Sequence, residues 1–377
     1  MKRRDCIKLS ALGAAGIACS DVLEAAEPKP RRRVEAKNDR NYSVVVIGDL
    51  HYDKLPAEVY HEGYSDPSPE REANHRKEFV RNDEMWKKRM RELLRRASRL
   101  RGEDTRMTIQ VGDLIQGDCG DAANHKILLD DAWCYVKGAV GGLPLVTVAG
   151  NHDLRGRDDK EVTEAYREYM SERMSEELGK PIAKTCFYYW IGKDAYIVVD
   201  FTNPDDEEID RMFNETLHAR YTFVIIHSPV IPYQHKSWAN WIIHGRDNNA
   251  EARRHFRRLL AERNAIVICG HTHTTEYALW EGDGGSISQV TVNSVWKNAS
   301  SASYNVISSN PDDWGAVVLM GGSDAMKDLI KEYKDGIRAF SIASSCGSYK
   351  LLVSDKGVKM EYYAGASEDV TEVFTLR

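Results

Sequence analysis

Five short polar clusters hold the residues of this chain that could do chemistry, and each cluster follows an apolar run. The clusters are Asp49-Leu50-His51, Gly112-Asp113, Gly150-Asn151-His152-Asp153, His227, and Gly270-His271-Thr272-His273. Turns favour glycine, asparagine and aspartate, so turn chemistry accounts for any one of these residues taken alone. It does not account for imidazoles and carboxylates at five strand ends in one chain. The clusters therefore predict one shared site.

The donor atoms in these clusters are those of a metal centre without thiolates. Imidazole and carboxylate together suit zinc, iron or manganese. Residues two apart on an extended segment point the same way, so Asp49 and His51 can face one site, as can His271 and His273. Seven donors are too many for one tetrahedral zinc ion. They suit two adjacent ions if one carboxylate bridges them.

The elements that must position these clusters are predicted from the apolar runs. Strands are expected at 42–48, 107–112, 143–149, 221–226 and 265–269, with hairpins at 186–200 and 350–363. After a loop over 52–75, apolar residues keep helical spacing to about Arg101, and another helix is expected over 250–263. The alternation of strands and helices indicates βαβ units. The carboxyl ends of strands in an open sheet line one crevice, so the clusters should meet there.

In this order the clusters resemble those of the calcineurin-like metallophosphoesterase superfamily, over residues 42 to about 275. The resemblance implies an α/β fold, a β-sandwich of mixed sheets flanked by helices, with two divalent or trivalent metal ions (manganese, iron or zinc) at the strand ends. The implied metal ligands form two groups joined by one bridging carboxylate: Asp49, His51 and His273, then Asn151, His227 and His271, with Asp113 as the bridge.

The Gly150–Asp153 cluster carries the remaining implied roles. His152 matches the histidine that contacts the substrate phosphate and assists the leaving oxygen. Asp153 is expected to orient His152 or a ligand, although it could instead cap a helix from residue 160 onward. Gly150 would permit a tight turn close to the site. The expected catalytic residues are therefore His152, Asp113 and Asp153.

The activity that the resemblance implies is hydrolysis of phosphate mono- or diesters by in-line attack of a hydroxide shared by the two ions. Purple acid phosphatases carry a metal-binding tyrosine shortly after the bridging aspartate, where this chain has Gln116, which disfavours that branch. The stretch GDLIQGD is closer to cyclic-nucleotide-phosphodiesterase-like members. Two alternatives are a non-enzymatic metal-binding scaffold, although every ligand position is filled, and a zinc amidohydrolase, although eight regular βα units are absent.

Substrate recognition is expected in three places. These are the 52–75 loop, the arginines Arg155 and Arg157, and the segment 233–245. Trp238 and Trp241 could stack on a base or sugar, or pack a loop against the core. The partner is a small-molecule or macromolecular phosphoester. A formal net charge of -6 does not indicate a nucleic-acid-binding surface.

The amino-terminal segment predicts export. Arg3-Arg4 before a short apolar stretch resembles a twin-arginine signal over residues 1–26. A polar linker follows over 27–41, and one domain spans 42–377, with 276–377 completing the sandwich. No run is long enough to span a bilayer. We expect a periplasmic or cell-surface bacterial protein, with Cys19 as a possible lipid anchor.

Overall fold

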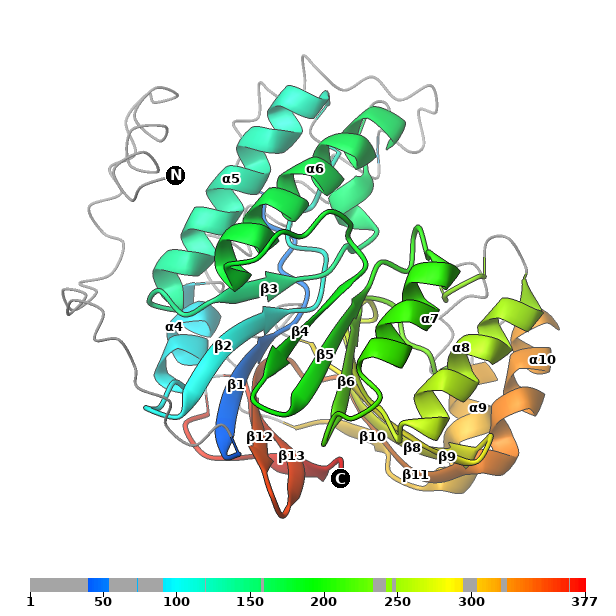
Figure 1. The fold of residues 1–377 in the computed structure, drawn as a ribbon. Helices are drawn as coiled ribbons and strands as arrows, with labels where there is room; N and C mark the ends of the chain where they lie inside the picture. The colour runs from blue at the N-terminus through cyan, green and yellow to red at the C-terminus, as the bar shows by residue number, and fades with distance from the viewer. Residues whose placement is uncertain are drawn as a thin grey trace.

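Two mixed β-sheets lie against each other, with helices over their outer faces (Figure 1). The computed structural model describes residues 40–53, 73, 91–118, 120–156, 159–232, 242–245, 249–293, 304–319, 324–365 and 367–377. The predicted fold class, a mixed α/β sandwich, is confirmed. The export signal, Cys19, the 52–75 loop (apart from its first two residues and Ala73) and most of the linker lie outside the described residues. Among the described helices none is long and apolar enough to cross a membrane.

The first sheet brings the start and the end of the chain together. Its order is β14 (Glu372–Thr375), β13 (Gly357–Ala364), β12 (Gly347–Ser354), β1 (Tyr42–Ile47), β2 (Thr105–Gln110) and β3 (Leu145–Thr147). Strands β1, β2 and β3 run parallel, and β12 pairs antiparallel with β1. The helices that accompany this sheet are α4 (Arg91–Arg99), α5 (Ala122–Ala139) and α6 (Asp159–Leu178).

The second sheet contains the strands that precede the two remaining polar clusters. Its order is β10 (Val306–Ser308), β11 (Ile337–Ala343), β8 (Thr275–Gly282), β9 (Gly285–Thr291), β7 (Ile266–Cys269), β6 (Thr222–Ile226), β5 (Asp194–Val199) and β4 (Phe187–Ile191). Strands β5, β6, β7 and β9 are parallel. The accompanying helices are α7 (Asp206–Glu215), α8 (Ala250–Glu262), α9 (Trp314–Leu319) and α10 (Asp324–Tyr333), with short 3-10 turns η5 (Pro311–Asp313) and η6 (Lys334–Gly336). A further 3-10 turn, η3 (His152–Leu154), follows β3 of the first sheet.

The core follows from strands that are apolar on both faces. Every residue of β1, β5, β6 and β7 is buried, as their continuous apolar sequences predict. Between the sheets, Tyr196 stacks on Phe223 with ring centroids 4.5 Å apart. A second apolar cluster lies between the β4–β11 sheet and its helices, and includes Phe256 and Trp314. The ligand-bearing strands are thus fixed from both sides.

One stretch differs from its prediction. The Ser/Asn-rich segment 298–314 reads from its composition as a surface loop. Of it, residues 304–314 are described, and they include β10, η5 and the first residue of α9. Trp314 is buried, because it packs into the apolar cluster beside the β4–β11 sheet. Strand β10 forms by edge pairing with β11, which composition alone does not reveal.

A buried charged network joins the two sheets at the amino ends of their strands, opposite the polar clusters. The carboxylate of Asp194 is fully buried and accepts bonds from Tyr42 Oη at 2.9 Å and from Arg220 Nε at 2.8 Å. Arg220 also donates to Asp355 at 2.6 Å in the β12–β13 turn. The network therefore ties β1, β5 and the late hairpin into one unit.

Replacing Arg220 by methionine should destabilise the fold while leaving the site intact. The substitution leaves the Asp194 carboxylate buried without its cation, which typically costs about 3 kcal/mol or more. Urea unfolding in the presence of a chelator measures the loss. The matched control is Arg338→Met, which breaks the exposed Arg338–Glu281 pair at 2.9 Å and should change little. Equal effects of the two substitutions would contradict the prediction.

Candidate metal centre

The five polar clusters converge in space, and they do so between two sheets rather than along one. Three clusters follow β1, β2 and β3 of the first sheet, and two follow β6 and β7 of the second. Three groups of side chains each bring their ligand atoms within 4.8 Å of one another: Asp49, His51 and His273; His51, Asp113 and His152; and Asp113, His227 and His271. The predicted meeting of the clusters is therefore observed.

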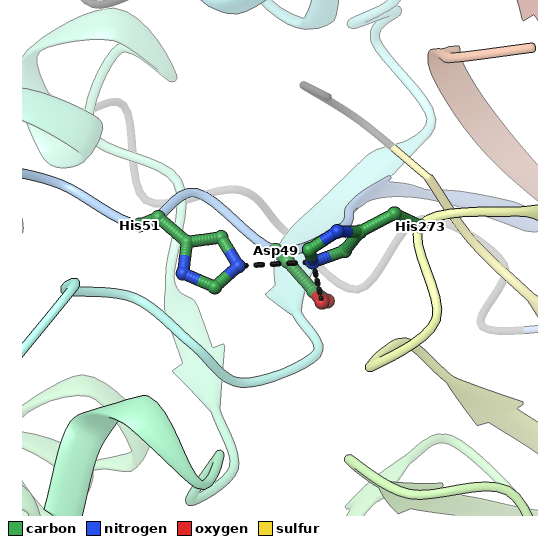
Figure 2. A group of neighbouring side chains, drawn as sticks. All are labelled: Asp49, His51 and His273. Carbon is green, nitrogen blue, oxygen red and sulfur yellow. Dashed lines mark hydrogen bonds and ion pairs between the residues drawn. The ribbon is translucent and has the colours of Figure 1, made fainter. Parts of the chain in front are cut away.

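The first group consists of residues that follow β1 in the first sheet and β7 in the second. Figure 2 shows Asp49, His51 and His273 pointing toward one another. His273 Nε2 is 3.0 Å from His51 Nε2 and 3.1 Å from Asp49 Oδ2. Asp49 also accepts the backbone N–H of His271 at 3.0 Å, so its carboxylate is fixed in direction. Two imidazole nitrogens and a carboxylate oxygen thus face one small volume.

The second group shares its carboxylate with the first. His227 Nε2 lies 3.3 Å from Asp113 Oδ2, from His271 Nδ1 and from Asn151 Oδ1. The same Asp113 Oδ2 is 3.7 Å from His51 Nε2, in the first group. Asp113 therefore stands between the two groups, where a bridging ligand would have to stand.

In two of the histidines, a hydrogen bond to Nδ1 directs the other ring nitrogen, Nε2, into the site. His227 Nδ1 lies 2.8 Å from the carbonyl oxygen of Val111, and His51 Nδ1 lies 3.0 Å from Gln116 Oε1. Both oxygens only accept, so each Nδ1 carries a proton and each Nε2 faces the site, where the neutral ring can offer its lone pair to a metal. Gln116 thus has a positioning contact that the sequence analysis missed. The available signal was a glutamine three residues beyond a ligand aspartate.

The turn after β3 holds His152 and Asp153 by different contacts. His152 donates its backbone N–H to Asp113 Oδ1 at 2.8 Å, and its Nδ1 lies 3.0 Å from the carbonyl oxygen of Gln116. Asp153 is fully buried and accepts N–H bonds from Ile115 at 3.0 Å and Gly150 at 2.9 Å. The carboxylate of Asp153 therefore bonds these two amides instead of capping a helix from residue 160 onward. Asp153 joins the loops that follow β2 and β3.

Two glycines allow the carboxylates to approach the backbone. A Cβ atom added to Gly150 would overlap Asp113 Oδ1, and one added to Gly270 would overlap Asp49 Oδ1. Each glycine therefore makes room for a carboxylate from another cluster. The predicted close approach at Gly150 is confirmed, and its reason is this packing.

Burial and one ion pair set the protonation of the metal-free site. Burial lowers the pKa of His51 to about 4 and that of His271 to about 3. Burial also opposes a charge on His227, but the nearby Asp113 carboxylate outweighs it and raises the His227 pKa to about 9. Burial, reinforced by Asp113, raises the pKa of Asp153 to about 8. Near neutral pH, the metal-free site thus holds a His227–Asp113 ion pair, with His51 and His271 neutral.

The matching family model decides the identity of this arrangement. It is the calcineurin-like phosphoesterase model, and it matches residues 42–275, from β1 through the last histidine cluster. The chain belongs to the calcineurin-like phosphoesterase family. The match covers more than half of the chain and all five polar clusters, and it confirms the resemblance inferred from their order. It makes the protein a metallophosphoesterase, without specifying which ester it cleaves.

Solved structures of low sequence identity resemble this chain, and that of PhoD shares the fold. The structure of PhoD has 10% identity and a TM-score of 0.50 over 89% of this chain and 68% of PhoD. The purple acid phosphatase PPD1 from yellow lupin has 14% identity and a TM-score of 0.49 over 89% of this chain and 53% of its own, so this chain spans about half its length. A dimetal phosphatase from Danio rerio has 12% identity and a TM-score of 0.46, over 90% of this chain and all of its own. No curated protein matches by sequence.

The donor set fits the metal ions that this family implies. The described residues provide imidazole nitrogens and carboxylate oxygens in groups that share Asp113, together with the amide oxygen of Asn151. Nitrogen and oxygen donors of this kind suit zinc, iron or manganese. Of the predicted recognition residues, Arg155 lies beside His152, whereas Arg157, Trp238 and Trp241 lie outside the described residues.

Metal affinity should rise with pH because a proton competes for His227. A metal binds the neutral imidazole, whereas His227 stays protonated in the metal-free protein until about pH 9. Since His51 and His271 are already neutral, His227 should add about one unit of slope to the log of the apparent affinity plotted against pH. Titrations with manganese from about pH 6 to 8.5 measure it. A slope unchanged in His227→Asn would contradict the assignment.

Replacing Gln116 by leucine should weaken metal binding selectively. The substitution removes the acceptor for His51 Nδ1 and lets the ring turn, and loss of such a partner typically costs about 10–100-fold in metal affinity. The measurement is metal content after dialysis against graded chelator. Gln116→Glu, which keeps the acceptor, is the control and should retain most of the affinity. Equal retention by both variants would show that the contact does not matter.

Proposed function

We propose that the protein hydrolyses phosphate mono- or diesters by direct in-line attack of water, without a covalent phosphoenzyme. The observation that carries this proposal is the position of Asp113 between two groups of ligand atoms. A single carboxylate that serves both groups suits a two-metal centre. In phosphoryl transfer, positioning and charge stabilisation supply most of the catalysis, and this arrangement is suited to both.

The ligand residues have separable roles in this proposal. Asp49, His51 and His273 would hold one metal ion; Asn151, His227 and His271 would hold the other; and Asp113 would contact both. Bound ions would acidify a water molecule and offset negative charge on the phosphoryl oxygens. The chain contributes the fixed direction of His51 and His227. Val111 and Gln116 hold the two ring tautomers through their oxygens.

His152 is proposed to face the substrate and to protonate or stabilise the leaving oxygen. Its backbone N–H is bonded to Asp113, and its Nδ1 faces the Gln116 carbonyl, so the ring has a fixed place and Nε2 is the nitrogen left to contact the leaving oxygen. The ring centroid is 4.4 Å from that of His51, which puts it beside the ligand groups. Asp153 supports His152 indirectly, because it joins the two loops that carry His152 and Asp113.

Export of the folded protein by a twin-arginine route is part of the proposal. Its support is the basic Arg3-Arg4 pair before a short apolar stretch in residues 1–26. Such a route moves proteins that are already folded, which suits a centre whose ligands come from two sheets. Lipid attachment at Cys19 is a second, separate proposal on the same segment.

Two substitutions should separate metal binding from proton transfer. Asp113→Asn should abolish nearly all hydrolysis and lower metal content, because a neutral amide bridges two cations poorly. His152→Ala should lower kcat by about 10²–10⁴-fold while metal content stays near that of the wild type. The assays are release of nitrophenol from a nitrophenyl phosphomonoester and from the bis-nitrophenyl diester, together with metal analysis.

The outcomes of these assays distinguish the possible functions of this site. Preference for the diester would identify a phosphodiesterase, and preference for the monoester a phosphatase. Loss of metals from His152→Ala would contradict the assigned division of roles. Stable binding of two metals without cleavage of any phosphoester would favour the alternative function, a metal-binding scaffold of the same fold.

A further inference from the structure

Arg155 lies against the proposed proton donor, and the metal ligands do not need it there. Its Nη1 is 2.9 Å from both ring nitrogens of His152, and its Nη2 is 3.2 Å from Asp118 Oδ2. The Arg155 side chain is 26% exposed, whereas that of Asp118 is 3% exposed. The guanidinium is therefore anchored on the protein side by a buried carboxylate and remains partly accessible next to His152.

The backbone around Arg155 is already fixed without this ion pair. Asp118 donates its N–H to the carbonyl oxygen of Arg155 at 2.8 Å, and Gly117 packs so tightly that an added Cβ would overlap the carbonyl oxygen of His152. The two loops are thus joined by backbone contacts and by Asp153. The Arg155–Asp118 side-chain pair is not required to join them. Its consequence is to hold a cation in one place beside His152.

We infer that Arg155 binds a non-esterified oxygen of the substrate phosphoryl group, and that Asp118 positions its guanidinium for this contact. This inference rests on the proposed function, since it assumes that the phosphoryl group lies beside His152. A guanidinium has five N–H donors in a planar fork, more than the contacts with His152 and Asp118 use. Charge-assisted bonds of this kind suit phosphate oxygens.

The position beside His152 also explains why an arginine suits this place better than a lysine. Nη1 of Arg155 is 2.9 Å from both ring nitrogens of His152, so the guanidinium lies against the imidazole ring itself. A phosphoryl oxygen that enters can accept N–H bonds from the guanidinium on this side of His152. The planar fork of Arg155 can keep its ion pair with Asp118 while it contacts the phosphoryl oxygen, whereas a lysine ammonium is a single point charge without that fork geometry.

Binding of inorganic phosphate tests the inference without requiring turnover. We would compare manganese-loaded wild type, Arg155→Met and Arg155→Lys by calorimetry with phosphate, and verify the metal content of each. Arg155→Met should weaken phosphate binding by about 10–100-fold, the range for lost hydrogen bonds to a charged group. Arg155→Lys should recover only part of it. The matched control is Arg338→Met, which should bind phosphate as the wild type does.

Two further measurements separate substrate contact from a structural role. Added guanidinium ion should restore part of the phosphate affinity to Arg155→Ala, which a lost structural support would not allow. Asp118→Asn should weaken phosphate binding less than Arg155→Met and leave metal content unchanged. Wild-type phosphate affinity in Arg155→Met, or loss of metal from both Arg155→Met and Asp118→Asn, would overturn the inference. Absence of ester hydrolysis by the wild type would instead count against the proposed function, since phosphate affinity decides the role of Arg155.

Discussion

The buried carboxylate of Asp113 is the group on which the rest of the site depends. It lies 3.3 Å from His227 and 3.7 Å from His51, and it accepts the backbone N–H of His152 at 2.8 Å. A buried anion is costly unless it is paired and hydrogen-bonded. Burial alone would raise its pKa, but His227 and the other histidines hold that pKa well below its usual range. Without bound cations, protonated His227 must supply the charge that compensates Asp113. A proton and a metal ion therefore compete for the His227 imidazole beside Asp113.

The two-sheet construction explains how such a costly cluster is tolerated. Ligands from β1 and β2 meet ligands from β6 and β7 because the sandwich brings two sets of strand ends together (Figure 1). The ligands His51, Asp113, His271 and His273 all have positive φ angles, between 45° and 74°. Non-glycine residues in that region cost of order 1–3 kcal/mol each and persist only where the surroundings enforce them. The buried strands β1, β2 and β7, which precede these residues, supply that enforcement.

The sequence was sufficient for the meeting of the polar clusters and insufficient for the contacts that support them. The convergence of Asp49, His227 and His271 could be predicted because each follows a continuous apolar strand, and strand ends collect at an edge. The assumption of a single crevice was too simple, since the edges belong to two sheets. Supports such as Gln116 bond across dozens of residues in the chain, so the place of Gln116 three residues beyond Asp113 did not reveal its partner, His51. The burial of Trp314 could not be predicted for a similar reason. Its polar neighbours in the sequence predict a loop, whereas the tertiary fold buries its side chain.

In the turn after β3, three consecutive residues point in different directions and make separate contacts. Asn151 turns toward His227, His152 is held by Asp113 and the Gln116 carbonyl, and Asp153 turns back into the core, where it bonds two backbone amides. Because burial keeps Asp153 protonated to about pH 8, it adds little negative charge beside Asp113 near neutral pH. The charged pair at this turn is instead Arg155 with Asp118, at the partly exposed side of His152. Charge is thus low where the backbone is fixed and positive where an anionic substrate would arrive, which is the distribution that phosphoryl transfer requires.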